Sequence, residues 1–173
     1  MNSTQALPNL HLILGGARSG KSRYGESLAQ ESGADVLYIA TAQALDVEMQ
    51  QRIAQHKLDR PKHWASIEEP VNLSDVITDS NSPVILVDCL TLWLMNLMEN
   101  KLDLTTAVDD LINVLTMQTG DVILVSNEVS MGVVPMGELS RNYVDELGRL
   151  HQKIAQIAGR VTLMVAGIPL KVK

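Results

Sequence analysis

Residues 15–22, with the sequence GGARSGKS, constrain this chain most, because they fit the phosphate-binding pattern G-x-x-x-x-G-K-[ST]. The apolar run Leu10–Leu14 precedes the pattern and predicts a strand, and the residues Lys21–Glu31 predict a helix. A strand, a loop and a helix in this order are the setting that the pattern requires. We therefore expect a phosphate-binding loop between this strand and this helix.

The residue types of this loop suit the binding of a phosphate chain. Glycines let the backbone approach phosphate oxygens, and the backbone N–H groups and the helix N-terminus then face the anion. Lys21 adds a positive charge near the β- and γ-phosphates, and the hydroxyl of Ser22 is a natural ligand for Mg²⁺. The nucleotide-binding residues predicted from the loop are Gly15, Gly16, Ala17, Arg18, Ser19, Gly20, Lys21 and Ser22.

Short apolar runs alternate with longer segments of helical period along the chain, which predicts an α/β fold with a mostly parallel sheet flanked by helices. A length of 173 residues predicts a single domain spanning residues 1–173. The predicted strands are Leu10–Leu14, Asp35–Ala40, Val84–Asp88, Val122–Ser126 and Val161–Ala166, with an edge strand near His63–Ile67. The predicted helices are Lys21–Glu31, Leu45–Leu58, Val71–Thr78, Leu90–Met98, Thr105–Met117 and Arg141–Ala158.

Composition and charge narrow the class of protein. The net charge of −6 argues against nucleic acid or an anionic membrane as the main partner. The single cysteine, Cys89, excludes an internal disulfide, and the apolar stretch Val84–Met98 is too short to span a bilayer. The first eight residues do not resemble a signal peptide. A cytoplasmic protein without a membrane span is the expectation.

Polar residues follow several predicted strands, at the edge where open α/β sheets bind ligands. Asp88 ends one strand and can hold Mg²⁺ opposite Ser22, or it can cap the helix that follows. Asn127 and Glu128 follow another strand. Glu128 can serve as a general base or as a partner of a metal ligand, or it can be an ordinary polar strand end.

The segment Leu45–Arg60 places Glu48, Arg52, His56 and Arg60 at intervals of four, so they share one face if the helix continues that far. Neighbouring cations lower the pKa of a histidine, which keeps the His56 ring neutral and nucleophilic. The same cations can neutralise phosphate oxygens during attack at phosphorus. Spacing alone leaves a second interpretation open, namely a solvated helix face held by ion pairs.

Other features carry less weight. Asn100–Asp103 fits the guanine-reading pattern N-K-x-D, but it follows a predicted helix rather than a buried strand, so we interpret it as a chance match. Cys89 is expected to be a small buried apolar residue, and His11, His63 and His151 are expected to be structural or on the surface.

In this order along the chain, five segments resemble the bifunctional adenosylcobinamide kinase / adenosylcobinamide-phosphate guanylyltransferase family of cobalamin biosynthesis. The resemblance runs from about Leu10 to the C-terminus. It is more specific than the phosphate loop alone. The segments are residues 15–23 (GGARSGKSR), 38–42 (YIATA), 52–61 (RIAQHKLDRP), 88–94 (DCLTLWL) and 127–135 (NEVSMGVVP).

The resemblance implies two reactions. A nucleoside triphosphate, ATP or GTP, phosphorylates adenosylcobinamide, and GTP then transfers GMP to adenosylcobinamide phosphate through a guanylyl-histidine at His56. It further implies a homo-oligomer, typically a trimer, and Mg²⁺ is the cofactor expected from the residues of the loop. The catalytic nucleophile implied is His56, and the chemistry of the loop adds Lys21 as the second catalytic residue. Beyond the loop, the nucleotide contacts implied are Ala40, Thr41, Ala42, Lys57, Leu58, Asp59, Arg60, Glu68 and Asp88, with Ser22 and Asp88 at the metal.

Two positions depart from the family pattern. Gln55 stands where many members have a second histidine, and His151 stands where the family often has asparagine. Two other functions stay open at this point: a small-molecule kinase with a phosphate loop but without a histidine intermediate, and a non-catalytic GTP-binding regulatory module.

Overall fold

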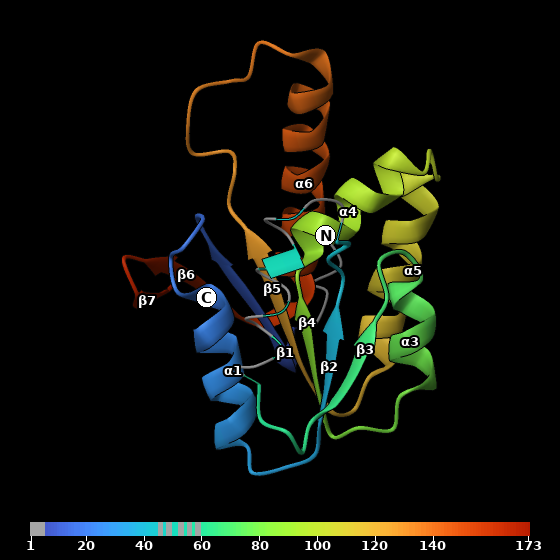
Figure 1. Cartoon of the computed structure of the whole chain (residues 1–173), viewed down its shortest axis with the longest axis vertical. Coiled ribbons are helices and arrows are strands. Elements are labelled where there is room, and N and C mark those ends of the chain that lie inside the picture. Colours follow the sequence, from blue (N-terminus) through green and yellow to red (C-terminus); the bar gives the residue numbers. More distant parts are fainter. Residues whose placement is uncertain (1–5, 45–46, 48–49, 52–53, 55–56, 58–59) are drawn as a thin grey trace.

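The computed structural model describes residues 6–44, 47, 50–51, 54, 57 and 60–173 (Figure 1). Within these residues, one seven-stranded sheet has the order β3-β2-β4-β5-β1-β6-β7. All neighbouring strands are parallel except β6 and β7, so the predicted α/β fold with a mostly parallel sheet is confirmed. The strands are β1 (Leu7–Gly15), β2 (Val36–Ala40), β3 (Ala65–Glu68), β4 (Val84–Asp88), β5 (Asp121–Asn127), β6 (Ala158–Val165) and β7 (Ile168–Lys171).

Different helices cover the two faces of the sheet (Figure 1). One face packs against α1, whose Gly25 lies so close to β5 that an added Cβ would stand 3.1 Å from Val125 Cγ2. The other face packs against α4 and α6, with α3 and α5 beside them. The helices are α1 (Lys21–Glu31), α3 (Leu73–Asp79), α4 (Leu90–Glu99), α5 (Leu104–Met117) and α6 (Glu138–Ile157).

Burial on both faces explains why the central strands read as continuous apolar runs. In β4, Val84 and Leu86 point to the α1 side, whereas Ile85 and Val87 point to the side of α4. The same alternation continues to the strand end, because side chains of a strand alternate between faces. Asp88 therefore lies on the α1 side of the sheet.

The register of the sheet brings the ends of the parallel strands to one edge. Asp88 lies opposite Ala40, which in turn lies opposite Glu68 of β3. On the other side, Gly15 at the end of β1 lies opposite Asn127 of β5. Because β5 lies between β1 and β4, its end separates the phosphate loop from Asp88.

Three predictions of secondary structure need correction. The strand β7 was not predicted, because Pro169 and the short run beside it argue against a strand. Pro169 is tolerated because β7 is an edge strand. Ala158 begins β6 instead of ending a helix, and α6 begins at Glu138 rather than Arg141.

Part of the predicted helix Leu45–Leu58 lies outside the described residues. The described residues of this stretch that are helical are Val47, Gln50, Gln51, Ala54 and Lys57.

Asn100–Asp103 lies in the turn between α4 and α5, as the chance-match interpretation requires. The carboxylate of Asp103 accepts a hydrogen bond from the Thr105 N–H at 3.0 Å and so caps α5.

Two histidines are buried in the core. His11 Nε2 lies 2.8 Å from Thr162 Oγ1, and His151 Nε2 lies 2.8 Å from Ser126 Oγ. Burial, together with the nearby Arg160, lowers the pKa of His11 to about 4. Burial also lowers the pKa of His151 to about 4, although Glu128 acts in the opposite direction. Both rings are therefore neutral at pH 7.

These histidines should make the stability of the protein fall with acidification. Below about pH 6.5 the unfolded chain binds protons that the folded chain excludes until about pH 4, so stability is lost as the pH falls through this window. We expect each histidine to cost roughly 1–2 kcal/mol between pH 7 and pH 5. Denaturant unfolding at both pH values measures this loss.

The matched variants are His11→Gln with His151→Gln, and His63→Gln, whose parent residue is exposed. The double variant should lose less stability than the wild type between pH 7 and pH 5, and the His63 variant should behave like the wild type. An unchanged pH dependence in the double variant would contradict the assignment.

Candidate nucleotide site

The phosphate loop follows β1 and has a backbone that only some residues tolerate. Gly20 has φ +92° and Arg18 has φ +57°, and the Ser19 N–H donates to Gly16 O at 3.2 Å. A Cβ on Gly15 would lie 2.5 Å from Ser19 Oγ and 3.0 Å from the backbone oxygen of Met164. Gly15 is thus required for close packing, and Gly20 for its left-handed conformation.

The start of α1 is suited to an anion. Gly20 caps the helix without a side-chain hydrogen bond, and the first turn carries no acidic residue. Lys21 and Ser22 are half-buried in this first turn, and Lys21 Nζ lies 3.4 Å from Gly16 O. Free N–H groups, the helix dipole and a lysine together favour a phosphate at this position.

The turn between β6 and β7 supports the loop from the side. The Gly167 N–H donates to Ser19 O at 3.0 Å, and a Cβ on Gly20 would lie 3.4 Å from Gly167 Cα. Ser19 is 8% exposed, and its hydroxyl has no hydrogen-bond partner among the described residues. A buried hydroxyl without a partner is unusual, and a phosphate oxygen would satisfy it.

Asp88 is held at the end of β4 by its neighbours. The phenol of Tyr38 donates to Asp88 Oδ2 at 3.0 Å. Burial and the negative charge of Asp88 raise the pKa of Tyr38 above its usual value, so the phenol keeps its proton. The buried hydroxyl of Thr41 donates to Cys89 O at 2.6 Å and accepts from the Cys89 N–H at 2.9 Å, which fixes the backbone next to Asp88.

The donors at this edge fit a hard cation such as Mg²⁺. Ser22 supplies a hydroxyl and Asp88 a carboxylate with one oxygen, Oδ1, that does not share the bond to Tyr38. No group of three or more His, Cys, Asp or Glu side chains that could hold a metal occurs among the described residues. Mg²⁺ is commonly held by one or two protein oxygens with substrate phosphates and waters completing its shell, so two donors suffice.

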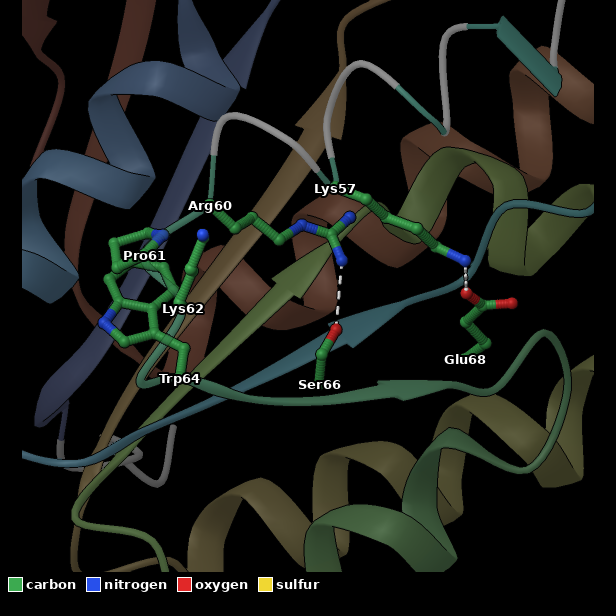
Figure 2. A pocket seen from close by; sticks show the side chains of 7 residues that line it. All are labelled: Lys57, Arg60, Pro61, Lys62, Trp64, Ser66 and Glu68. Carbon is green, nitrogen blue, oxygen red and sulfur yellow. Dashed lines mark hydrogen bonds and ion pairs between the residues drawn. The ribbon is translucent and has the colours of Figure 1, made fainter.

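A pocket of about 330 Å³ lies beside β3 (Figure 2). In the strand order β3-β2-β4-β5-β1, Asp88 of β4 lies between this pocket and the loop that follows β1. Lys57 forms an ion pair with Glu68, and Arg60 Nη1 donates to Ser66 Oγ at 3.0 Å. Figure 2 shows the two cationic side chains extending across the same hollow. The lining residues are Lys57, Arg60, Pro61, Lys62, Trp64, Ser66 and Glu68.

Arg60 links this pocket to Asp88. Its guanidinium carbon lies 3.6 Å from the centre of the Tyr38 ring, and the phenol of the same ring binds Asp88. A guanidinium stacked on an aromatic ring is held by cation–π attraction. Tyr38 therefore positions a cation of the pocket and a carboxylate of the strand edge at the same time.

The structure brings many of the predicted site residues to this edge. Gly15–Ser22, Ala40, Thr41, Ala42 and Asp88 lie at or just after the strand ends, and Lys57, Arg60 and Glu68 share the pocket. The predicted residues His56, Leu58 and Asp59 lie outside the described residues. The side chain of Thr41 has a structural role, because its hydroxyl binds the backbone of Cys89. Contact of any of these residues with a nucleotide remains a prediction.

Cys89 is buried, and burial with the nearby Asp88 raises the pKa of its thiol to about 11. The thiol is therefore protonated at neutral pH, in agreement with its prediction as a small buried apolar residue.

Sequence analysis missed several residues of the site. Tyr38, Trp64 and Ser66 were read as parts of strands or of the segment near β3, yet Tyr38 binds Asp88 and the other two line the pocket. The rarity of aromatic residues is the one signal that singles out Tyr38 and Trp64, since the chain has five.

The connection between β5 and α6 rises from the same edge (Figure 1). At its start the Glu128 N–H donates to Gly15 O at 3.0 Å, and the Glu128 carboxylate accepts from the N–H and hydroxyl of Ser130. The apolar side chains that follow are largely exposed: Met131 75%, Val133 95%, Val134 74%, Met136 98% and Leu139 70%. Among the described residues, no helix is long and apolar enough to cross a membrane.

Known proteins similar to this chain were found by sequence and by structure. The chain is 54% identical over 166 residues to the bifunctional adenosylcobalamin biosynthesis protein CobP of Pseudomonas aeruginosa, covering 94% of this chain and 96% of that protein. It is 41% identical over 179 residues to the bifunctional adenosylcobalamin biosynthesis protein CobU of Salmonella typhimurium, covering 94% and 98%.

A solved structure of the RadB recombinase is similar in fold, with a TM-score of 0.50 and 16% identity over 90% of this chain and 74% of that chain. At that identity the likeness shows the fold alone, an α/β fold. Residues 11–172 match the family described as cobinamide kinase / cobinamide phosphate guanyltransferase. With a family match over most of its length, and relatives covered almost from end to end, this chain belongs to the cobinamide kinase / cobinamide phosphate guanyltransferase family of cobalamin biosynthesis enzymes.

Proposed function

We propose that this protein, as a single domain, phosphorylates adenosylcobinamide with a nucleoside triphosphate and then transfers GMP from GTP to the resulting phosphate. The products of the second reaction are adenosylcobinamide-GDP and pyrophosphate. Membership of the family supports the two activities. The observation that carries the proposal is the layout of the sheet edge, where Asp88 lies between a phosphate loop and a pocket with three cations.

The phosphate loop is the proposed grip for both reactions. Lys21 and the N–H groups at the start of α1 neutralise the triphosphate, and Ser19 supplies a hydroxyl that lacks a protein partner among the described residues. Ser22 and Asp88 would hold Mg²⁺, which when bound offsets negative charge on the phosphates. Tyr38 keeps Asp88 in place by its hydrogen bond.

In the guanylyl transfer, His56 is the proposed nucleophile. A ring nitrogen bonds to the α-phosphorus of GTP while the bond from that phosphorus to the bridging oxygen breaks, and pyrophosphate leaves with the electron pair. An oxygen of adenosylcobinamide phosphate then bonds to the same phosphorus, and the phosphorus–nitrogen bond breaks to restore the histidine. Lys57 and Arg60, close to His56 in sequence, lie in the pocket and provide positive charge for these steps.

The rival is a kinase with a phosphate loop and no histidine intermediate. It requires the loop and Asp88 but gives no role to the three cations gathered beside Glu68. Such a concentration of positive charge in a chain of net charge −6 favours the additional phosphate chemistry.

We also propose that the protein is a homo-oligomer, with a trimer as the expected state. The exposed apolar side chains between β5 and α6 support an interface between copies, as do Ile168, Leu170 and Val172 near the C-terminus. Large apolar side chains exposed close together in the sequence often mark an interaction surface.

The histidine intermediate predicts a covalent label. After incubation with GTP labelled at the α-phosphate and then denaturation, the wild type should retain an acid-labile, base-stable label. His56→Ala should lose it, and His63→Ala, which changes an exposed histidine outside the proposed mechanism, should retain it. Absence of label in the wild type, or equal labelling of His56→Ala, would contradict the mechanism.

If the protein is a trimer, its mass in solution should depend on the exposed apolar side chains between β5 and α6. Light scattering after size exclusion should give the wild type a mass three times that of the 18.9 kDa chain. Val133→Asp with Met136→Asp should shift it to the monomer, because charge on an apolar interface is costly to bury. Met117→Asp alters a residue that is 78% exposed elsewhere and should leave the mass unchanged. A monomeric wild type would overturn the proposal.

A further inference from the structure

A buried network of hydrogen bonds at the end of β5 connects three elements, α6, β5 and α4. His151 of α6 has Nε2 2.8 Å from the hydroxyl of Ser126, the residue before the last one of β5. Ser126 Oγ lies 3.1 Å from Thr91 Oγ1 of α4. Thr91 Oγ1 in turn accepts from the N–H of Asn127 at 2.6 Å. These hydrogen bonds therefore run from α6, on the face of the sheet opposite α1, to the last residue of β5.

The three side chains of this network, those of Ser126, Thr91 and His151, are buried. Ser126 is 0% exposed, Thr91 6% and His151 8%. Tyr143 of α6 adds a hydrogen bond from its phenol to Thr91 O at 2.9 Å, so α6 contacts this threonine directly as well. Buried polar groups that are fully hydrogen-bonded hold their neighbours in one arrangement.

Asn127 connects this hydrogen-bond network to the nucleotide site. It lies opposite Gly15, the first residue of the phosphate loop, and the following Glu128 N–H donates to Gly15 O at 3.0 Å. Because side chains alternate along a strand, Asn127 faces the α1 side of the sheet while Ser126 faces α6. Asp88 ends the strand on the other side of β5.

The side chain of Asn127 has an unsatisfied polar atom. Its Oδ1 is buried and has no hydrogen-bond partner among the described residues. A buried amide oxygen without a donor is rare in folded proteins, and at the edge of a binding site it indicates a donor supplied by a ligand. The kinase reaction brings such a donor, since the group that it phosphorylates is a hydroxyl.

We propose that Asn127 is a further residue that contacts the substrate in the kinase step, where it accepts a hydrogen bond from the acceptor hydroxyl, and that His151 positions Asn127 through Ser126 and Thr91. In that step the acceptor oxygen bonds to the terminal phosphorus. The bond from that phosphorus to the bridging oxygen breaks, a nucleoside diphosphate leaves with the electron pair, and the hydroxyl proton passes to solvent. Asn127 orients the hydroxyl and takes no proton. This inference rests on the proposed kinase activity.

The inference separates the two half-reactions. Attack of a histidine on GTP involves no acceptor hydroxyl, so the guanylylation of the protein should not need Asn127. A residue that held the nucleotide phosphates would instead affect both reactions, because both use a triphosphate in the loop. A purely structural role of His151 would lower stability without changing one reaction selectively.

The test measures three quantities for each variant: kcat and KM for phosphorylation of adenosylcobinamide with ATP, the rate of labelling by α-labelled GTP, and the melting temperature. Asn127→Ala should lower the kinase kcat on the order of tenfold and leave labelling within about twofold of wild type, since orientation of the acceptor affects only its own reaction. His151→Ala should lower the kinase kcat by several-fold with little change in KM for ATP. His151→Gln, whose amide reaches the position of Nε2, should recover most of that loss.

His11→Gln is the matched control, because His11 is also buried and binds a hydroxyl, that of Thr162, away from the strand ends. It should lower the melting temperature without a selective effect on the kinase step. Equal losses in kinase and labelling for Asn127→Ala, or a His151→Ala variant that behaves like His11→Gln, would overturn the inference. A wild type that is labelled but has no kinase activity would overturn the proposed kinase step as well, which distinguishes that failure from the others.

Discussion

The site depends on one constraint, the position of the end of β1 between two parallel strands. Gly15 is paired with Asn127 of β5 and with Met164 of β6, so the loop leaves the sheet from a point fixed on both sides. The Glu128 N–H and the Gly167 N–H then bind Gly15 O and Ser19 O. Left-handed residues strain the backbone, so the loop would not keep this conformation without support. These neighbours hold it in the conformation that exposes its N–H groups.

Positive charge gathers at the site although the net charge of the protein is negative. The chain has a net charge of −6, yet the sheet edge gathers Lys21 on one side of Asp88 and Lys57, Arg60 and Lys62 on the other. Tyr38 joins the two halves, because its ring carries Arg60 and its phenol binds Asp88. This arrangement attracts a phosphate chain locally while the rest of the surface repels polyanions.

The sequence predicted what depends on local pattern. The strand Val84–Asp88 and the helix Lys21–Glu31 agree with the structure residue for residue, because apolar runs specify the strand and helical periodicity the helix. The loop lies between β1 and this helix as predicted, although Gly15 ends β1 and Lys21 begins α1. The sequence did not predict what depends on pairing between distant segments. Tyr38 and Asp88 are 50 residues apart, and Ser126 lies 25 residues before His151, so no spacing rule connects them. The edge strand β7 was not predicted, because Pro169 argues against a strand at this position.

The central claim is that one phosphate loop serves both half-reactions. It is tested most directly by measuring self-guanylylation at several GTP concentrations in the presence of a non-hydrolysable ATP analogue with a β,γ-imido bridge. If both triphosphates occupy the same loop, the analogue should inhibit labelling competitively with GTP, with an inhibition constant equal to its dissociation constant measured by direct binding. Full labelling at saturating analogue would contradict the claim, because it would require a second triphosphate site.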